Sequence, residues 1–186
     1  MVVQTARRLF TTDEYHRMMQ NGVLTEDDRV ELIAGEILEM SPISSRHAAC
    51  VNRLTQLLSL RMASRAIVSV QNPIHLGAHS EPQPDVALLQ PRDDFYADAH
   101  PEPADILLIV EVAETSQDFD RAVKLPLYAR SGISVVWLVD LQNDNVQTYS
   151  QPTPNGYSEI HQLWRGQTVT LQAFPDVSIP VNDILG

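Results

Sequence analysis

Two carboxylates and one lysine are the side chains of this sequence whose types and settings indicate chemistry. Glu111 lies inside the apolar run Ile106 to Ala113, which is typical of a strand covered on both faces. An ionised carboxylate is costly there unless a cation or several hydrogen bonds compensate it. Asp85 follows a proline and opens a second apolar run, Val86 to Leu89, and Lys124 is the only lysine of the chain. Two acids and one lysine in this order indicate a hydrolytic metal site.

The elements that must position these residues begin with an N-terminal helix and a hairpin. Thr11 and Glu14 have the spacing of a capping box, which predicts a short helix from about Asp13 to Met19. The alternating runs 29–33 and 36–40 are joined by an Ala-Gly pair, which indicates a tight hairpin.

Glu31 of this hairpin is open to two interpretations. A glutamate on a half-buried hairpin usually points to solvent. Glu31, however, interrupts the apolar residues Val30, Leu32 and Ile33, and if the even positions face solvent it shares the inward face with Ile33. In that arrangement it could act as a ligand of the site.

A helix from about Ser45 to Ala63 is predicted next, with a serine at its N-cap. His47 begins its apolar stripe and is either a buried core residue or an ionisable residue of the site. Three arginines follow another stripe of this helix, at Arg46, Arg53 and Arg61. They form either a solvated face or a row of phosphate contacts.

The segment between this helix and the Glu111 strand contains two irregular stretches. Residues 66–76 read as a strand that is bent or on an edge at Asn72-Pro73. Residues 91–104 are rich in proline and predict a long surface loop, which either covers the site or only connects two strands.

The last third of the chain is predicted to hold one helix and several strands. The helical run 120–130 contains Pro126, so the helix either starts late or kinks there. An apolar strand follows at 133–139, and the alternating runs 145–150 and 168–174 indicate antiparallel strands.

Length and composition predict one domain, residues 1–186, which is large enough to bury a core without disulfides. Cys50 is the only cysteine, and its apolar neighbourhood indicates a small buried side chain without chemistry. No apolar run is long enough to span a membrane, and no secretory signal is recognisable, so a cytoplasmic location is expected.

The net charge of -11 opposes attraction to a polyanion, and so argues against a nucleic-acid partner. It does not exclude one, because carboxylates gathered around a divalent cation make a site acidic in any case.

The order of these elements resembles the core of the PD-(D/E)xK, restriction-endonuclease-like nucleases, and the chain resembles the Uma2 family (DUF820) more closely. The residues that carry the resemblance span most of the chain: Glu31-Leu-Ile-Ala-Gly-Glu36, Ser41-Pro42, His47, Glu81-Pro-Gln-Pro-Asp85-Val-Ala-Leu, Val110-Glu111-Val112, Asp120, Lys124, Tyr128, Gly132 and Trp137-Leu-Val-Asp140. The resemblance implies an α/β (α+β) fold with a restriction-endonuclease-like core. In that fold a central mixed β-sheet is flanked by helices, with an N-terminal hairpin and C-terminal antiparallel strands.

The resemblance also implies an activity, that of an endonuclease dependent on Mg²⁺ or Mn²⁺ that hydrolyses phosphodiester bonds in DNA. Asp85 and Glu111 would be the metal ligands. Lys124 would be the catalytic lysine, which orients or deprotonates water and offsets charge developing on the phosphate. Because many such enzymes cut two strands with two subunits, a homodimer is expected.

Two departures from the parent pattern leave part of the site open. The position where the pattern keeps its lysine, two residues after the second acid, is Ala113 here, so the lysine is expected on the following helix. The helix 45–63, which would carry the first acidic residue, contains no Asp or Glu. Glu31 or His47 is expected to complete the site instead.

Two other functions fit the same residues. The first is a catalytically inactive restriction-endonuclease-like fold that serves as a protein- or nucleic-acid-binding module, for which the acidic composition is unremarkable. The second is a hydrolase of a small phosphorylated molecule, because metal-assisted phosphoryl chemistry does not name its substrate.

Overall fold

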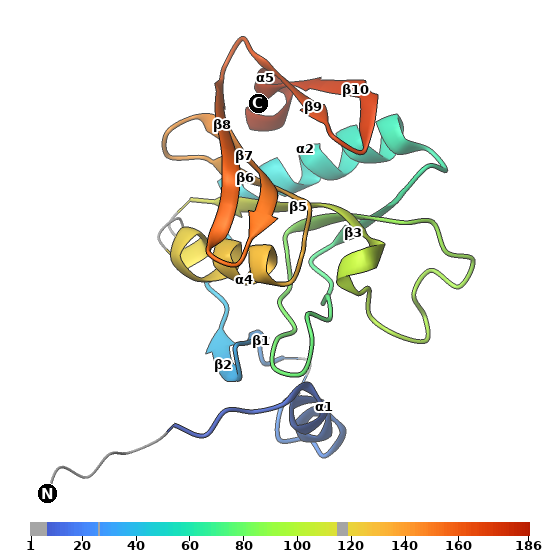
Figure 1. Ribbon diagram of the computed structural model, residues 1–186, viewed down its shortest axis with the longest axis vertical. Helices are drawn as coiled ribbons and strands as arrows, with labels where there is room; N and C mark the ends of the chain where they lie inside the picture. The colour runs from blue at the N-terminus through green and yellow to red at the C-terminus, as the bar shows by residue number, and fades with distance from the viewer. Residues whose placement is uncertain (1–6, 26, 115–118) are drawn as a thin grey trace, which may run out of the picture.

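A central six-stranded sheet organises the protein, whose computed structural model describes residues 7–25, 27–114 and 119–186 (Figure 1). The strand order is β3-β4-β5-β6-β7-β8, and every neighbouring pair is antiparallel except β5 and β6. The strands are β3 (Ile67–Val70), β4 (Val86–Leu89), β5 (Ile106–Ala113), β6 (Val135–Asp140), β7 (Asn145–Thr153) and β8 (Gly156–Trp164). The expected mixed central sheet flanked by helices is confirmed.

Apolar residues cover both faces of this sheet, which explains the continuous apolar run of β5. On one face Val110 belongs to the cluster that includes α2 (Ser45–Met62). On the other face Ile109 belongs to the cluster that includes α4 (Leu125–Arg130). Figure 1 shows the two helices on opposite sides of the sheet. Because side chains alternate along a strand, Glu111 lies on the α4 face.

The N-terminal elements are α1 (Thr12–Gln20) and a separate hairpin of β1 (Val30–Ile33) and β2 (Glu36–Glu39), and they lie together at one end of the molecule (Figure 1). The side chain of Thr11 accepts from the backbone N–H of Glu14, whose carboxylate accepts from the backbone N–H of Thr11. The predicted capping box and the predicted hairpin are therefore both confirmed.

The strand predicted for residues 66–76 ends at Val70, so its second half was predicted wrongly. Gln71 has a positive φ of 51°, and the proline at position 73 has no N–H for a ladder, so pairing stops there. The chain then folds back on itself, with Ile74 N donating to Pro82 O (3.0 Å). This return brings Asp85 to the start of β4.

The helical run 120–130 consists of two helical elements of different geometry, which meet just before Pro126. Asp120–Lys124 form a π-helical turn, η2, and α4 follows with Pro126 in its first turn. The backbone N–H of Leu125 donates to Asp120 O, five residues back. Of the two expected solutions, a late start of the α-helix is the correct one.

The C-terminal segment adds a second antiparallel pair, β9 (Thr168–Leu171) and β10 (Phe174–Pro180), and the helix α5 (Val181–Leu185). The predicted single run 168–174 was wrong, because a turn divides it between β9 and β10. The strand β8 was not predicted either. Antiparallel strands at the C-terminus are confirmed, and together with α5 they pack into the core on the α2 side of the sheet. Among the described residues, no helix combines the length and the apolar character needed to cross a membrane.

Candidate active site

One cavity of about 610 Å³ collects all five side chains singled out from the sequence: Glu31, His47, Asp85, Glu111 and Lys124. They come from β1, the first turn of α2, the approach to β4, β5 and η2. The strands β4 and β5 pair in a register that places Val86 opposite Val110. One step further along each strand are Asp85 and Glu111, so the antiparallel pairing brings these two acids to the same end of the sheet.

Lys124 is buried between two carboxylates. Its Nζ lies 3.3 Å from Glu31 Oε2 and 3.3 Å from Glu111 Oε1, and the residue is 6% exposed. Burial disfavours the ammonium, but the attraction of Glu111 and Glu31 outweighs it, so the pKa of Lys124 lies above its ordinary value. Lys124 therefore remains a cation at neutral pH.

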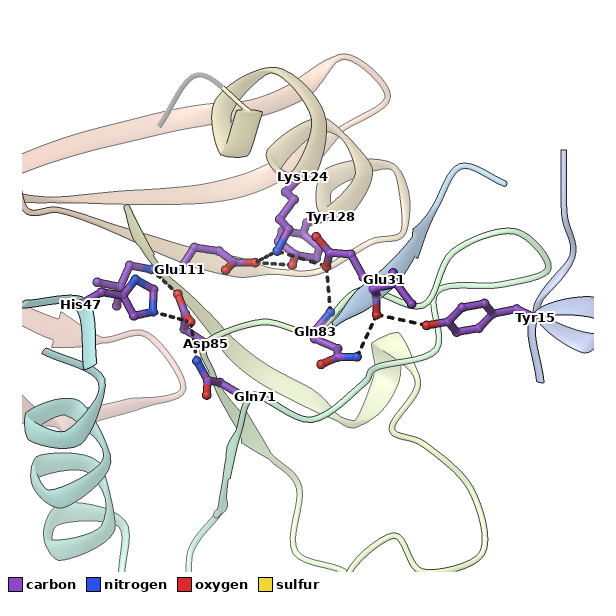
Figure 2. Close-up of polar contacts among 11 residues, drawn as sticks. Tyr15, Glu31, His47, Gln71, Gln83, Asp85, Glu111, Lys124 and Tyr128 are labelled. Carbon is purple, nitrogen blue, oxygen red and sulfur yellow. Dashed lines mark hydrogen bonds and ion pairs between the residues drawn. The ribbon is translucent and has the colours of Figure 1, made fainter. Parts of the chain in front are cut away.

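The ionised form of Glu111 is only partly stabilised by Lys124, because Lys124 also pairs with Glu31. Burial raises the pKa of Glu111 to about 8, although the nearby Lys124 opposes this shift. The hydroxyl of Tyr128 donates to Glu111 Oε1, which also fixes the side chain (Figure 2). Two buried carboxylates thus share one ammonium, and at neutral pH the proton that Glu111 keeps takes the place of a second cation.

Asp85 has a separate set of partners, on the side of the cavity nearer α2 (Figure 2). Its Oδ1 lies 2.9 Å from His47 Nε2 and accepts from Gln71 Nε2 (3.2 Å), and its Oδ2 accepts from the backbone N–H of Val112 (2.9 Å). The hydrogen bond to Asp85 raises the pKa of His47 above its ordinary value, against the effect of burial. His47 thus faces the cavity and is not a residue of the apolar core.

Glu31 is turned inward, which agrees with the second of its two interpretations. The condition attached to that interpretation does not hold, because Leu32, at an even position, is fully buried as well. Glu31 is 5% exposed, and its Oε2 accepts from the backbone N–H of Gln83 (3.1 Å) as well as lying near Lys124. A buried acid at this position was recognisable from the sequence, but its lysine partner was not.

Two sets of alternatives about the surroundings of the site were left open by the sequence. The arginines of α2 make contacts with other parts of the protein. Arg46 pairs with Asp144 (3.3 Å), and Arg53 donates to the carbonyl oxygens of Ile184 and Leu185. The loop 91–104 contributes no residue to the lining of the cavity, so it connects strands and does not cover the site.

Three residues of the site had no signal in the sequence strong enough to assign them to it. Gln71 and Gln83 lie in irregular segments, and their amides reach Asp85 and the Val30 carbonyl oxygen. Tyr128 is fully buried, and its hydroxyl donates to Glu111. The role of each of these three residues depends on a contact with a distant part of the chain, which cannot be inferred from sequence spacing.

The family to which the chain belongs follows from a match over most of its length. The sequence profile of Uma2, described as "Putative restriction endonuclease", matches residues 12–182. The chain belongs to the Uma2 family. No curated protein matches this Uma2 chain in sequence.

Among solved structures, the Uma2 chain is similar to a protein from Anabaena variabilis ATCC 29413 described as a "putative nuclease belonging to DUF820". The TM-score is 0.74 at 16% sequence identity, over 95% of this chain and 97% of the other. At this identity the likeness establishes a shared fold.

The donor atoms of the Uma2 cavity fit a hard divalent cation. The lining includes six carboxylates, at Glu31, Glu39, Asp85, Glu111, Glu114 and Asp120, against the cations Arg29 and Lys124. Carboxylate oxygens are the ligands that Mg²⁺ and Mn²⁺ prefer, and a cation beside Glu111 would favour the ionised form that burial disfavours. Within the described ranges, however, these acids do not form a group of three with ligand atoms within 4.8 Å of one another.

Proposed function

We propose that this Uma2 protein is a divalent-metal-dependent endonuclease that hydrolyses phosphodiester bonds in DNA. The observation that carries the proposal is Lys124 Nζ, held 3.3 Å from both Glu31 and Glu111 in the cavity that Asp85 also lines. Phosphoryl transfer requires little covalent chemistry from a protein and much positioning and charge. An acidic cavity with one fixed ammonium can supply both once a cation is present.

In this proposal Asp85 and Glu111 hold Mg²⁺ or Mn²⁺. When bound, the metal would polarise the phosphoryl group and favour ionisation of the attacking water. The three fixed partners of Asp85 hold its carboxylate in place, and Tyr128 does the same for Glu111. The protein thus prepares its ligands before the cation arrives.

Lys124 is proposed to stabilise the charge that develops on the phosphate. Its pKa lies above the ordinary value, so it acts as a fixed positive charge and hydrogen-bond donor. Glu31 takes the place of the acid absent from α2 and positions Lys124. His47 is a positioning residue for Asp85, which it contacts at 2.9 Å.

A nuclease assay with Mn²⁺ or Mg²⁺ on plasmid, single-stranded and branched DNA tests this function. Cleavage that requires the metal, and that is lost in Asp85→Asn and Glu111→Gln, is the expected result. Glu159→Gln is the matched control, because Glu159 is an exposed residue of β8. Metal-independent cleavage, or full activity in Asp85→Asn, would contradict the proposal.

The net charge of -11, which disfavours a nucleic-acid substrate, supports one alternative, a catalytically inactive module that binds a protein. Calorimetric titration with Mg²⁺ and Mn²⁺ separates the two functions. The nuclease must bind at least one cation with an affinity that Asp85→Asn weakens. An inactive module has no reason to bind either cation.

We also propose a homodimer located in the cytoplasm. Two subunits can place two sites on the two strands of a duplex. Ile160 and Trp164 of β8 are exposed apolar side chains on an edge strand, a suitable place for a partner copy. Sedimentation velocity at micromolar concentration is expected to show a dimer, and a monomer alone would contradict this part of the proposal.

A further inference from the structure

A second cluster of ionisable residues lies outside the active-site cavity, around the buried carboxylate of Glu81. This residue is 2% exposed, and both of its carboxylate oxygens lie 2.9 Å from His16 Nε2. His75 Nδ1 lies 3.7 Å from Oε2, and His100 Nε2 lies 4.0 Å from Oε1. Within the described part of the chain, the ion pairs of Glu81 are formed with histidines and with no lysine or arginine.

The three histidines come from three segments that are far apart in the sequence. His16 lies on α1, His75 in the return between β3 and β4, and His100 in the loop before β5. The ligand atoms of His16, Glu81 and His100 all lie within 4.8 Å of one another. No other group of three His, Cys, Asp or Glu side chains in residues 7–25, 27–114 and 119–186 meets this condition.

The backbone holds this cluster in place. The N–H of Glu81 donates to Leu32 O (2.7 Å), which ties the carboxylate to the hairpin, and the N–H of His75 donates to Pro101 O (2.8 Å). Each histidine side chain is 32–43% exposed, whereas the Glu81 side chain is 1% exposed. The cluster is therefore a buried anion with a rim of imidazoles that solvent and ions can reach.

We propose that Glu81 and these histidines bind a Zn²⁺ ion that fastens α1 to the body of the protein. In a tetrahedral zinc site with bonds of about 2.0–2.2 Å, ligand atoms lie about 3.3–3.6 Å apart, so the atoms need to move by about 1 Å or less. Imidazole nitrogens select zinc over Mg²⁺, which prefers oxygen ligands. His16, Glu81 and His100 form the core of the site. His75, whose Nδ1 lies 3.7 Å from Glu81 Oε2 but which is outside that group, would have to move further to supply the fourth ligand.

The site would act on structure and not on phosphodiester chemistry. Its residues are absent from the lining of the active-site cavity. The zinc joins α1 and two loops to Glu81, which is bonded through the backbone to Leu32, the neighbour of Glu31. Binding should therefore restrain the hairpin that carries Glu31. The proposal does not depend on the nuclease function.

The test starts from the full chain freed of metal with a chelator and dialysed. We expect one Zn²⁺ per chain by elemental analysis after addition of zinc and removal of the excess. Substitution of Co²⁺ should give the intense visible absorption of a tetrahedral centre. Addition of zinc should also slow hydrogen exchange of the amides of α1, because the ion fixes that helix.

His16→Gln and His100→Gln should each weaken zinc affinity at least tenfold and abolish the slowing of exchange in α1. His161→Gln is the matched control, since His161 is exposed on β8 and lies outside the cluster. Asp85→Asn should leave this zinc affinity unchanged, which separates the site from the proposed catalytic metal. These measurements do not require an active enzyme.

Three results would overturn the proposal. The first is wild-type protein that retains no zinc. The second is a zinc affinity in His16→Gln and His100→Gln equal to that of His161→Gln. The third is a zinc coordination shell without imidazole in the X-ray absorption spectrum of the zinc-loaded wild type, a measurement that also decides the matter if either variant does not fold.

Discussion

A single ammonium shared by two buried carboxylates determines the electrostatics of the candidate active site. Glu31 and Glu111 together stabilise Lys124 as a cation, whereas the two carboxylates have to share the single positive charge of Lys124. Buried charges that lose their partner cost several kcal/mol, so the three residues depend on one another for stability. If the proposed function is correct, substitutions of these residues change stability and catalysis together.

Replacement of Lys124 by alanine is expected to lower turnover by about a hundredfold or more, as loss of a preorganised charge typically does. Metal affinity should not fall, since a positive charge leaves the neighbourhood of the ligands. Lys124→Arg should restore little, because the bulkier guanidinium must fit a space in which the lysine is 6% exposed. Steady-state cleavage rates and calorimetry measure both quantities.

Lys124→Ala should also destabilise the protein by about 3–5 kcal/mol, because Glu31 and Glu111 are left buried together without a cation. Glu31→Gln combined with Lys124→Met should recover part of this loss in urea unfolding. Arg130→Ala, at the exposed end of α4, is the control for loss of a positive charge. A folded Lys124→Ala protein with wild-type turnover would remove the lysine from the mechanism.

Glu111 gives the metal-free protein a specific dependence on pH. Its pKa is about 8 in the folded chain and near 4.5 when unfolded, so the folded state binds the extra proton between these values. Stability should therefore be greatest below about pH 4.5 for this group and fall as pH rises towards 8, by on the order of a few kcal/mol. Urea unfolding in a chelator at pH 5 and pH 8 measures the difference.

Glu111→Gln should flatten this dependence, because the amide does not titrate. A divalent cation should also reduce it in the wild type, since the metal favours the ionised carboxylate. An equal slope in the wild type and in Glu111→Gln would show that another group is responsible.

At the scale of the element, the π turn η2 sets the direction of Lys124. Pro126 has no N–H, and in an α-helix its ring would meet the carbonyl of Ala122. The wider turn Asp120–Lys124 avoids this contact just before α4 begins. Turns of this kind are frequent at functional sites because they redirect single side chains.

Pro126→Ala is expected to let this segment relax towards a regular α-helix and to move the ammonium of Lys124 away from Glu31 and Glu111. Cleavage should slow about tenfold or more, whereas the free energy of unfolding should change by no more than about 1 kcal/mol. Leu125→Val in the same turn is the control for packing. Unchanged cleavage in Pro126→Ala would mean that tertiary contacts, and not the proline, maintain η2.

The elements that could be predicted from the sequence are those whose signal is local. The capping box at Thr11 and the apolar run around Glu111 depend on neighbours a few residues away. The strand β8 has a mostly exposed, polar pattern and was missed, because its pairing with β7 depends on partners and not on its own residues. The acids and the lysine of the site could be recognised by type, but their geometry depends on contacts between distant segments.

At the scale of the whole molecule, the C-terminal segment is part of the core and not an addition to it. Val169, Ile179 and Ile184 are buried in the cluster that covers the α2 face of the sheet. The guanidinium of Arg53 on α2 holds the last turn through the carbonyl oxygens of Ile184 and Leu185.

Arg53→Met is expected to destabilise the protein by about 1–3 kcal/mol, because two carbonyl oxygens lose a charged donor while the apolar part of the side chain is retained. Arg61→Met is the matched control on the same helix and should cost less than about 0.5 kcal/mol, since Arg61 is exposed. Chemical denaturation measures both. Equal effects would show that Arg53 does not secure α5.

The ion pair between Glu31 and Lys124 also has a consequence for the order in which the protein is made. The hairpin with Glu31 leaves the ribosome long before η2 does. Until η2 emerges, Lys124 cannot pair with the carboxylate of Glu31. Docking of the hairpin must wait for Lys124 to emerge. A nascent chain therefore carries the acids of the candidate site in an unassembled form, and the site can be completed only after most of the protein has been synthesised.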